Sequence, residues 1–332
     1  MKARQATVVA SLVTLTAVLF CLALAYGITE TPWSALLGSV TGATDAATVI
    51  VREIRLPRAL LALLIGAGLG VAGAALQALL RNPLAEPGIL GISAGSALGA
   101  VIVYYSGLSL RFGFALPLGG FLGAAGVTVG LYLLAHRQLS TVGLILAGVA
   151  VNSFAGACVA LLLNLAPNPY AAYEIYFWLM GSVTDRSLWH VGLVAPFILS
   201  GIAILVRHAP QLDALVLGEE SARSLGVDIG KLRRRLILGT ALAVGPGVAV
   251  AGTIGFVGML VPHLLRTCLS NQPRLIVPAS ALGGAVLTLA ADLLVRITMV
   301  NGELKLGVIT GLLGAPLFLL VALRMTSERI WR

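Results

Sequence analysis

The chain contains long apolar runs that carry no charged side chain and are separated by short polar stretches. The run over 59–80 is representative, since Gln77 is its only strongly polar residue. A helix needs about 20 apolar residues to cross the hydrocarbon core of a bilayer. The pattern therefore predicts an all-α, polytopic membrane protein with about ten transmembrane helices. The predicted spans are residues 7–27, 59–80, 88–106, 112–135, 143–164, 190–206, 236–252, 254–269, 275–297 and 306–324.

The run over 59–80 also contains GLGVAG at 68–73, a formal match to the G-x-G-x-x-G dinucleotide fingerprint. That fingerprint needs a preceding strand and an acidic residue about 20 positions further on. Read as a helix, the same segment places Gly66, Gly70 and Ala74 on one face. Small residues at this spacing let another helix approach closely within a membrane. We therefore interpret the glycines as helix-packing residues.

Composition and charge support this interpretation. The sequence is 58% hydrophobic and only 11% charged, against about 25% charged residues in soluble domains. We predict one transmembrane domain over 1–332. With the N-terminus inside and ten alternating spans, fifteen Lys and Arg residues fall on the inner side and seven on the outer side. The positive-inside rule therefore places both termini in the cytoplasm, and the net charge of +9 needs no nucleic acid partner.

The N-terminal segment has two interpretations. Lys2, Arg4, an apolar run and the sequence ALA at 23–25 are typical of a cleavable signal peptide. The run over 7–27 is also long enough to be a first spanning helix that is retained, and we favour retention.

Two segments are too polar to span a membrane. Residues 165–189 are aromatic and amphipathic, which predicts a helix over about 168–182 at the outer surface. Residues 207–235 form the longest predicted inner loop. Within it, Asp213 precedes an apolar run that Gly226 closes, so we expect one or two short helices there.

The sequence shows no pattern typical of catalysis or of a bound metal or cofactor. It lacks a P-loop, an H-E-x-x-H motif and paired cysteines. His263 and Asp292, both near the ends of spans, are the only candidates for a proton or ion relay within the membrane. Asp292 lies four residues from Arg296, which predicts an ion pair. We expect a transporter subunit that is not an enzyme and that takes its energy from another chain. An ion-coupled secondary transporter or channel is the alternative, and a membrane enzyme is a third, less favoured class.

Five stretches, in the same order, resemble the FecCD-type permeases, especially the vitamin B12 branch. These permeases are the membrane subunits of bacterial ABC importers for ferric siderophores, haem and vitamin B12. The stretches are RLPRALLALLIGAGLGVAGAALQALLRNPLAEPGILGISAG (55–95), LSTVGLILAGVA (139–150), LGEESARSLGV (217–227), GTIGFVGMLVPHLLR (252–266) and LKLGVITGLLGAPLF (304–318).

The resemblance implies the type II ABC importer fold in the bacterial inner membrane. It also implies a homodimer, two ATPase subunits and a periplasmic substrate-binding protein as partners. The cargo it implies is an iron chelate, either a siderophore or haem, or else cobalamin.

Three sets of residues acquire roles from the resemblance. The inner loop would pack against the ATPase through Gly218, Glu219, Ala222, Arg223 and Gly226, although the same segment is also compatible with an ordinary solvated loop. Outer-face arginines would bind glutamates of the binding protein. They are Arg55, Arg58 and Arg296. Anchoring to lipid headgroups is the alternative for these arginines, and more so for Arg52.

The third set is the gate, which the resemblance places between the fourth and fifth spans. Adjacent hydroxyl residues form it in vitamin B12 permeases, whereas Thr141 is followed here by Val142. Because apolar constrictions can close by dewetting, a gate at this position is still expected. The change does weaken the case for cobalamin as cargo. Asn152 and Asn164 on the fifth span are candidates for the pathway lining, and packing roles are equally compatible with them.

Overall fold

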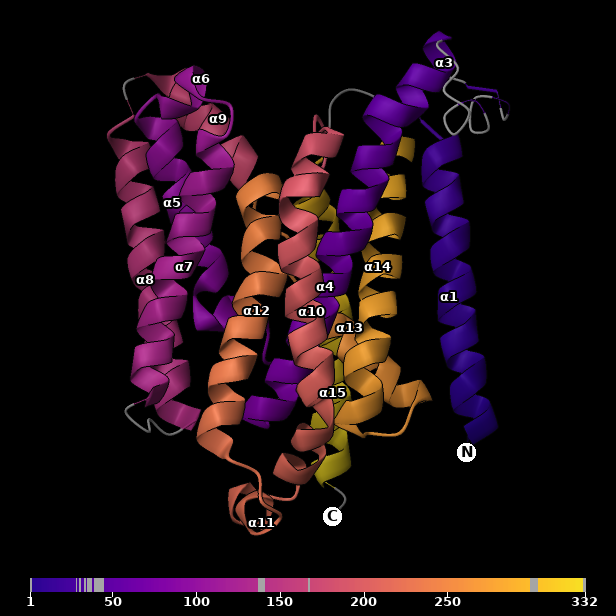
Figure 1. The fold of residues 1–332 in the computed structure, drawn as a ribbon, viewed down its shortest axis with the longest axis vertical. Helices are drawn as coiled ribbons and strands as arrows, with labels where there is room; N and C mark the ends of the chain where they lie inside the picture. Colours follow the sequence, from indigo (N-terminus) through magenta and orange to yellow (C-terminus); the bar gives the residue numbers. More distant parts are fainter. Residues whose placement is uncertain are drawn as a thin grey trace.

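The structure is a computed structural model that describes residues 2–27, 29, 31, 32, 34, 38, 45–136, 141–166, 168–298 and 304–330. Every regular element in these ranges is helical (Figure 1). The elements are α1 (Lys2–Ala25), α3 (Ala46–Val49), the π-helical η1 (Ile50–Arg55), α4 (Leu56–Leu80), the 3₁₀ turn η2 (Pro87–Leu90), α5 (Ile92–Tyr105), α6 (Leu108–Arg111), α7 (Ala115–His136), α8 (Thr141–Asn164), α9 (Pro169–Leu179), α10 (Leu188–Val216), α11 (Glu219–Ser224), α12 (Ile229–Ala251), α13 (Val257–Cys268), α14 (Pro273–Ile297) and α15 (Leu306–Ile330).

Each of the ten predicted spans contains a helix, which confirms the predicted fold class. Within the described ranges, seven helices are long and apolar enough to cross a membrane. Among the others, α5 has 14 residues and α13 has 12, so each is shorter than a complete span. A Cβ atom at Gly73 of α4 would overlap the carbonyl group of Gly258, the second residue of α13. The helix α13 therefore begins against the C-terminal half of α4, inside the protein, where non-helical backbone is tolerated.

The structure also differs from the prediction around the inner loop. The helix α10 continues to Val216, whereas the predicted span ended at 206. The extension is amphipathic and buries Leu212 and Leu215 against the rest of the bundle. Only α11 and its two short connections then separate α10 from α12. Hydropathy did not predict this part of the helix, because its exposed face is polar and only its apolar face packs against the bundle.

The helix α4 lies at the centre of the bundle, and its glycines explain its position. Cβ atoms at Gly66 and Gly70 would overlap the carbonyl groups of Gly284 and Ser280 on α14. The hydroxyl of Thr288 also donates a hydrogen bond to the carbonyl of Ala62 across this contact, at 2.7 Å. The segment GLGVAG is therefore the middle of a packed helix, as interpreted from the sequence, and it forms no nucleotide-binding turn.

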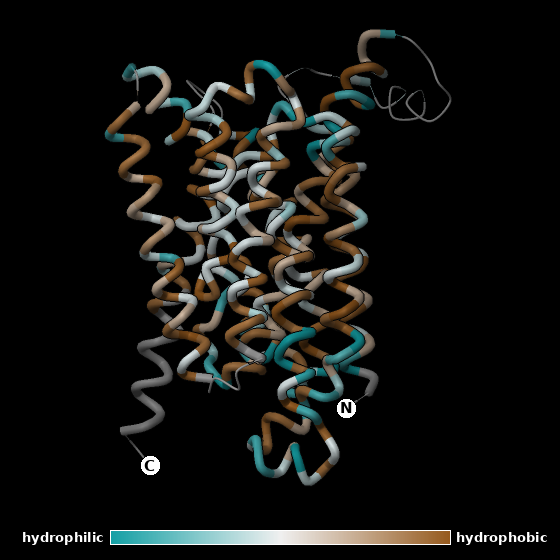
Figure 2. Tube along the Cα trace, turned by 60° about the vertical axis from the view of Figure 1, so that its left-hand side comes forward, coloured by the Kyte–Doolittle hydropathy of each residue, from teal (hydrophilic) through white to brown (hydrophobic). Residues whose placement is uncertain are grey.

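The bundle has two distinct ends (Figure 1). The start of α1, the connection α11 and the end of α15 lie at one end, which we call the α11 end. The helices α3, α6 and α9 lie at the opposite end, which we call the α9 end. Figure 2 shows mostly apolar residues along the length of the bundle and hydrophilic residues concentrated towards the two ends. This distribution is typical of a protein that spans a bilayer.

Candidate functional site

The short helix α11 is delimited by two glycines in conformations that favour glycine. Gly218 precedes it with a φ of 113°, and Gly226 follows it with a φ of 83°. Side chains other than glycine rarely adopt these angles. The amide of Gly226 donates to the carbonyl of Arg223 at 2.9 Å, and that of Val227 donates to the carbonyl of Ala222 at 3.0 Å. These bonds close the helix and fix the direction in which the chain continues to α12.

The side chains of α11 attach it firmly to α12. Ala222 is fully buried. The carboxylate of Glu219 lies 3.4 Å from the guanidinium of Arg233, whose side chain is only 8% exposed on α12. The same carboxylate lies 3.6 Å from the guanidinium of Arg223, which is 67% exposed. One face of α11 is therefore fixed to the bundle, while most of the Arg223 side chain stays exposed.

The start of α12 is capped by a further acid. The carboxylate of Asp228 accepts a hydrogen bond from the amide of Lys231 at 2.9 Å. This bond lowers the pKa of Asp228 below its usual value. Since α11 is held at both of its ends, it can transmit a movement as a rigid unit, which a flexible linker cannot do.

A hollow of about 540 Å³ lies beside α11, between this helix and the end of α4. It is lined by residues of both charges and by the glycine that precedes α11. Its lining residues are Leu80, Arg81, Leu217, Gly218, Glu219, Glu220 and Ser221. The hollow, together with Arg223, forms a concave and charged surface at the α11 end.

At the α9 end, two of the predicted docking arginines are buried. Arg55 is 4% exposed and Arg296 is 6% exposed. Arg55 donates to the carbonyls of Leu24, at 3.0 Å, and Ala25, at 2.5 Å, and also binds the carbonyl of Thr29 and the hydroxyl of Thr31. Arg296 donates to the carbonyls of Ala23 and Tyr26, at 2.6 and 3.0 Å. These bonds satisfy carbonyl groups that the end of α1 would otherwise leave without partners.

Arg58, the third of the predicted docking arginines, shares an acid with Arg296. Asp292 is fully buried on α14. Its carboxylate lies 2.5 Å from Nη2 of Arg296 and 2.8 Å from Nε of Arg58, whose side chain is 11% exposed. The predicted pair four residues apart is therefore confirmed. The bond to Arg58 on α4 was missed, since no local pattern relates two residues that lie so far apart in the sequence. Docking by these arginines remains a prediction.

The predicted gate lies partly outside the described residues. Thr141 is the first residue of α8, but its side chain and residues 137–140 are outside the part of the chain that the structure describes. Val142 is 64% exposed, and Asn152 and Asn164 are also exposed. Together with Phe154, which is 69% exposed, they belong to a helix with much uncovered surface. Their gate and pathway roles remain predictions.

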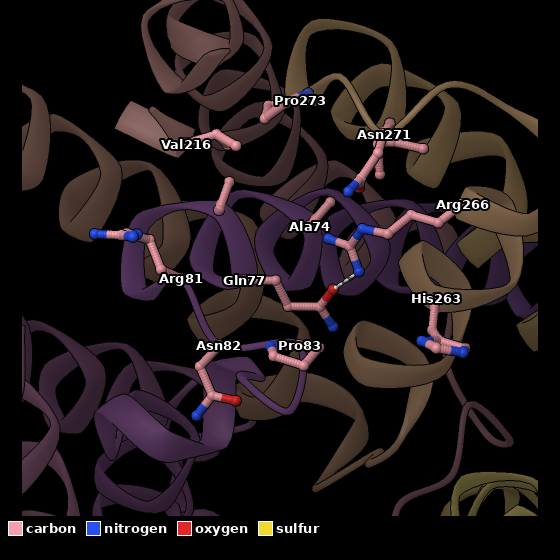
Figure 3. Close-up of a pocket in the computed structure, with 12 residues that line it drawn as sticks. Ala74, Gln77, Arg81, Asn82, Pro83, Val216, His263, Arg266, Asn271 and Pro273 are labelled. Carbon is pink, nitrogen blue, oxygen red and sulfur yellow. Dashed lines mark hydrogen bonds between the residues drawn. The ribbon is translucent and has the colours of Figure 1, made fainter. Parts of the chain in front are cut away.

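A second hollow at the α11 end was not predicted. It has a volume of about 390 Å³ and lies where α4, α10 and α13 end and α14 begins (Figure 3). Gln77 is 3% exposed, and its Nε2 donates to the carbonyl of Met259 at 3.2 Å. Its Oε1 accepts a hydrogen bond from Nη1 of Arg266 at 2.5 Å. His263, a candidate from the sequence, also lines this hollow. Gln77, the only strongly polar residue within 59–80, was a usable sign in the sequence of a polar site on this helix, but it did not indicate Arg266.

Comparisons with known proteins cover nearly the entire chain. The model of the FecCD transport family matches residues 15–324. The vitamin B12 import system permease of Vibrio cholerae is 44% identical over 276 residues, which are 83% of this chain and 83% of that protein. The hemin transport system permease of Yersinia pestis is 39% identical over 296 residues, which are 87% of each chain. A solved metal-chelate type ABC transporter in an inward-facing conformation superimposes with a TM-score of 0.83 at 30% identity, covering 96% of this chain and 99% of that one.

Proposed function

Because this chain belongs to the FecCD transport family, we propose that it moves a metal chelate through the membrane as the permease subunit of an ABC importer. The observation that carries the proposal is the likeness to a metal-chelate type ABC transporter over 96% of the chain. The relatives named above carry vitamin B12 and hemin. The cargo proposed here is therefore haem or cobalamin, with a ferric siderophore as the third member of the class.

The permease works as part of an assembly. Two copies of the chain bind two ATPase subunits, and a periplasmic binding protein delivers the chelate to the α9 end. Both termini and α11 lie on the cytoplasmic side, in agreement with the excess of Lys and Arg there. ATP is hydrolysed on the ATPase chains, and the permease itself has no catalytic role.

Coupling to the ATPase takes place at α11. The hollow between α11 and the end of α4 receives a projection of the ATPase, and Arg223 contributes an exposed positive charge. Closure of the ATPase dimer pushes α11. Since Ala222 is buried and Glu219 is paired with Arg233, α12 follows this movement. The residues to which we assign coupling are Gly218, Glu219, Ala222, Arg223 and Gly226.

The remaining roles follow the same arrangement. Thr141 and Val142 form the cytoplasmic gate, and Asn152 and Asn164 line the pathway on α8. The binding protein docks beside Arg58, the most exposed of the three predicted docking arginines. Arg55 and Arg296 bind the end of α1 and thereby support the surface on which the binding protein docks. Docking therefore depends on one arginine directly and on two through the position of α1.

Purification and uptake together test this proposal. The chain is co-expressed with its ATPase, purified in detergent and reconstituted into liposomes that contain ATP. We expect the ATPase to co-purify, and we expect cyanocobalamin or haemin to be taken up only when the binding protein and ATP are present. Uptake driven by a proton or sodium gradient without ATP would instead support the secondary transporter.

A further inference from the structure

The hollow beside Gln77 holds a half-buried positive charge, Arg266, without an acidic partner among its lining residues. These twelve residues are Ala74, Gln77, Ala78, Arg81, Asn82, Pro83, Val216, His263, Arg266, Asn271, Pro273 and Ile276, and none of them is acidic. In the part of the chain that the structure describes, the one hydrogen bond of the Arg266 side chain goes to the neutral amide of Gln77. A guanidinium carries five N–H donors and a full charge, so most of its binding capacity remains unused.

The polar groups of the hollow converge. Figure 3 shows the guanidinium of Arg266 directed at Gln77, and the side-chain amide of Asn271 directed towards the same region from the connection between α13 and α14. Gln77 also donates to the carbonyls of Met259 and Gly258, and these bonds hold its amide group in place against α13. Arg81 adds a second positive charge at the far rim, although its side chain points away from the centre.

The position of the hollow indicates the kind of anion. Three helices end around it and α14 begins there, so it lies at the depth at which spanning helices leave the hydrocarbon core. Phospholipid headgroups occupy this depth, and basic pockets between transmembrane helices bind anionic headgroups. Half of the lining is apolar, from Ala74, Ala78, Val216, Pro273 and Ile276 among others. An amphiphile fits such a site better than a small soluble ion does.

We propose that this hollow binds the phosphate of an anionic phospholipid, with Arg266 as its main ligand and Asn271 as a second donor. The fork of the guanidinium suits two phosphate oxygens. The apolar lining accommodates the glycerol and the first part of an acyl chain. The bound lipid then joins the ends of α4, α10 and α13 to the start of α14, beside the hollow in which α11 meets its partner.

Native mass spectrometry of the full chain in detergent tests the site. Phosphatidylglycerol is titrated against the wild type, Arg266→Gln, Arg266→Lys and Arg207→Gln, which removes an exposed arginine of α10 as a matched control. We expect one phosphatidylglycerol to bind per chain in preference to phosphatidylcholine. Loss of a charge-assisted bond should weaken that binding at least about tenfold in Arg266→Gln. Phosphatidylglycerol binding should weaken less in Arg266→Lys and remain unchanged in Arg207→Gln.

Two further arms separate the possible sources of phosphate. Thermal unfolding is measured with phosphatidylglycerol, with phosphatidylcholine and with inorganic phosphate, on the wild type and on Arg266→Lys in case Arg266→Gln fails to fold. Stabilisation by phosphatidylglycerol alone supports the proposal. Stabilisation by inorganic phosphate alone overturns the lipid and assigns a soluble anion. Equal phosphatidylglycerol binding by the wild type and both Arg266 variants overturns the site itself.

Discussion

Asp292 of α14 and Arg58 of α4 form an ion pair in which Nε and the carboxylate oxygen lie 2.8 Å apart. The same carboxylate also binds Arg296, so one acid serves two guanidiniums. Arg296 in turn binds two carbonyl groups at the end of α1. Three helices that are distant in the sequence, α1, α4 and α14, are therefore joined through a single buried carboxylate.

Replacement of Asp292 by Asn should strongly destabilise the protein. The change leaves two arginines beside each other without their shared counter-charge, and removal of one partner from a buried ion pair costs about 3–5 kcal/mol. Thermal unfolding of the purified protein in detergent measures the loss. Glu53→Gln is the control, because Glu53 pairs with Arg52 at the surface and such pairs contribute about 0–1 kcal/mol. Equal melting temperatures for both variants would contradict the assigned role.

A side chain at Gly226 should uncouple ATP hydrolysis from transport. No atom lies within 4 Å of the position of a Cβ there, so Gly226→Val meets no clash, and its effect comes from the φ of 83°. The strain should cost of the order of 1–3 kcal/mol and displace the end of α11. Gly107→Val is the matched control at the α9 end, since Gly107 has a φ of 70° and equally open surroundings.

The readouts for this pair are transport and the stimulation of ATPase activity by the binding protein. We expect both to fall in Gly226→Val, and more so when it is combined with Arg223→Glu. Gly107→Val should keep them. If both glycine variants transport like the wild type, α11 does not carry the coupling.

Cysteines at the predicted gate should cross-link between two copies of the chain. We replace Cys21, Cys158 and Cys268 first and then introduce Thr141→Cys or Val142→Cys. A gate on the two-fold axis brings the same residue of both copies together in at least one nucleotide state, and Val142 is exposed enough to reach its counterpart. Leu110→Cys, at a position that is 92% exposed at the α9 end, is the control. Absence of a gate cross-link in every nucleotide state would place the gate elsewhere.

Arg58→Lys should weaken capture of the binding protein. Lysine retains the charge that Asp292 requires, but an ammonium cannot bind a partner carboxylate through two parallel bonds. A pair near the surface contributes up to about 1 kcal/mol, so the affinity should fall by as much as about fivefold. The loss should also depend on ionic strength. Surface capture at low and high salt measures it, with Arg111→Lys as the control. Unchanged capture would contradict a docking role for Arg58 and leave it only its structural ion pair with Asp292.

Part of the candidate sites was predictable because it depends on local rules. Gly226 closes α11 in a conformation that favours glycine, and Asp292 and Arg296 pair because they lie one helical turn apart. By contrast, Arg266 meets Gln77 across 189 positions, and Arg58 meets Asp292 across 234. No local pattern encodes contacts of that kind.

The sequence by itself determined that the chain crosses a membrane many times and is helical throughout its spans. A bilayer leaves backbone groups no partner other than their own helix, so apolar length is sufficient evidence. It also determined the family, through motifs that keep their order. Only the tertiary structure decided that Arg55 and Arg296 are buried, that α10 continues to Val216 and that a basic hollow lies beside Gln77. These features depend on which helices pack against each other, and hydropathy does not specify the neighbour that each apolar face meets.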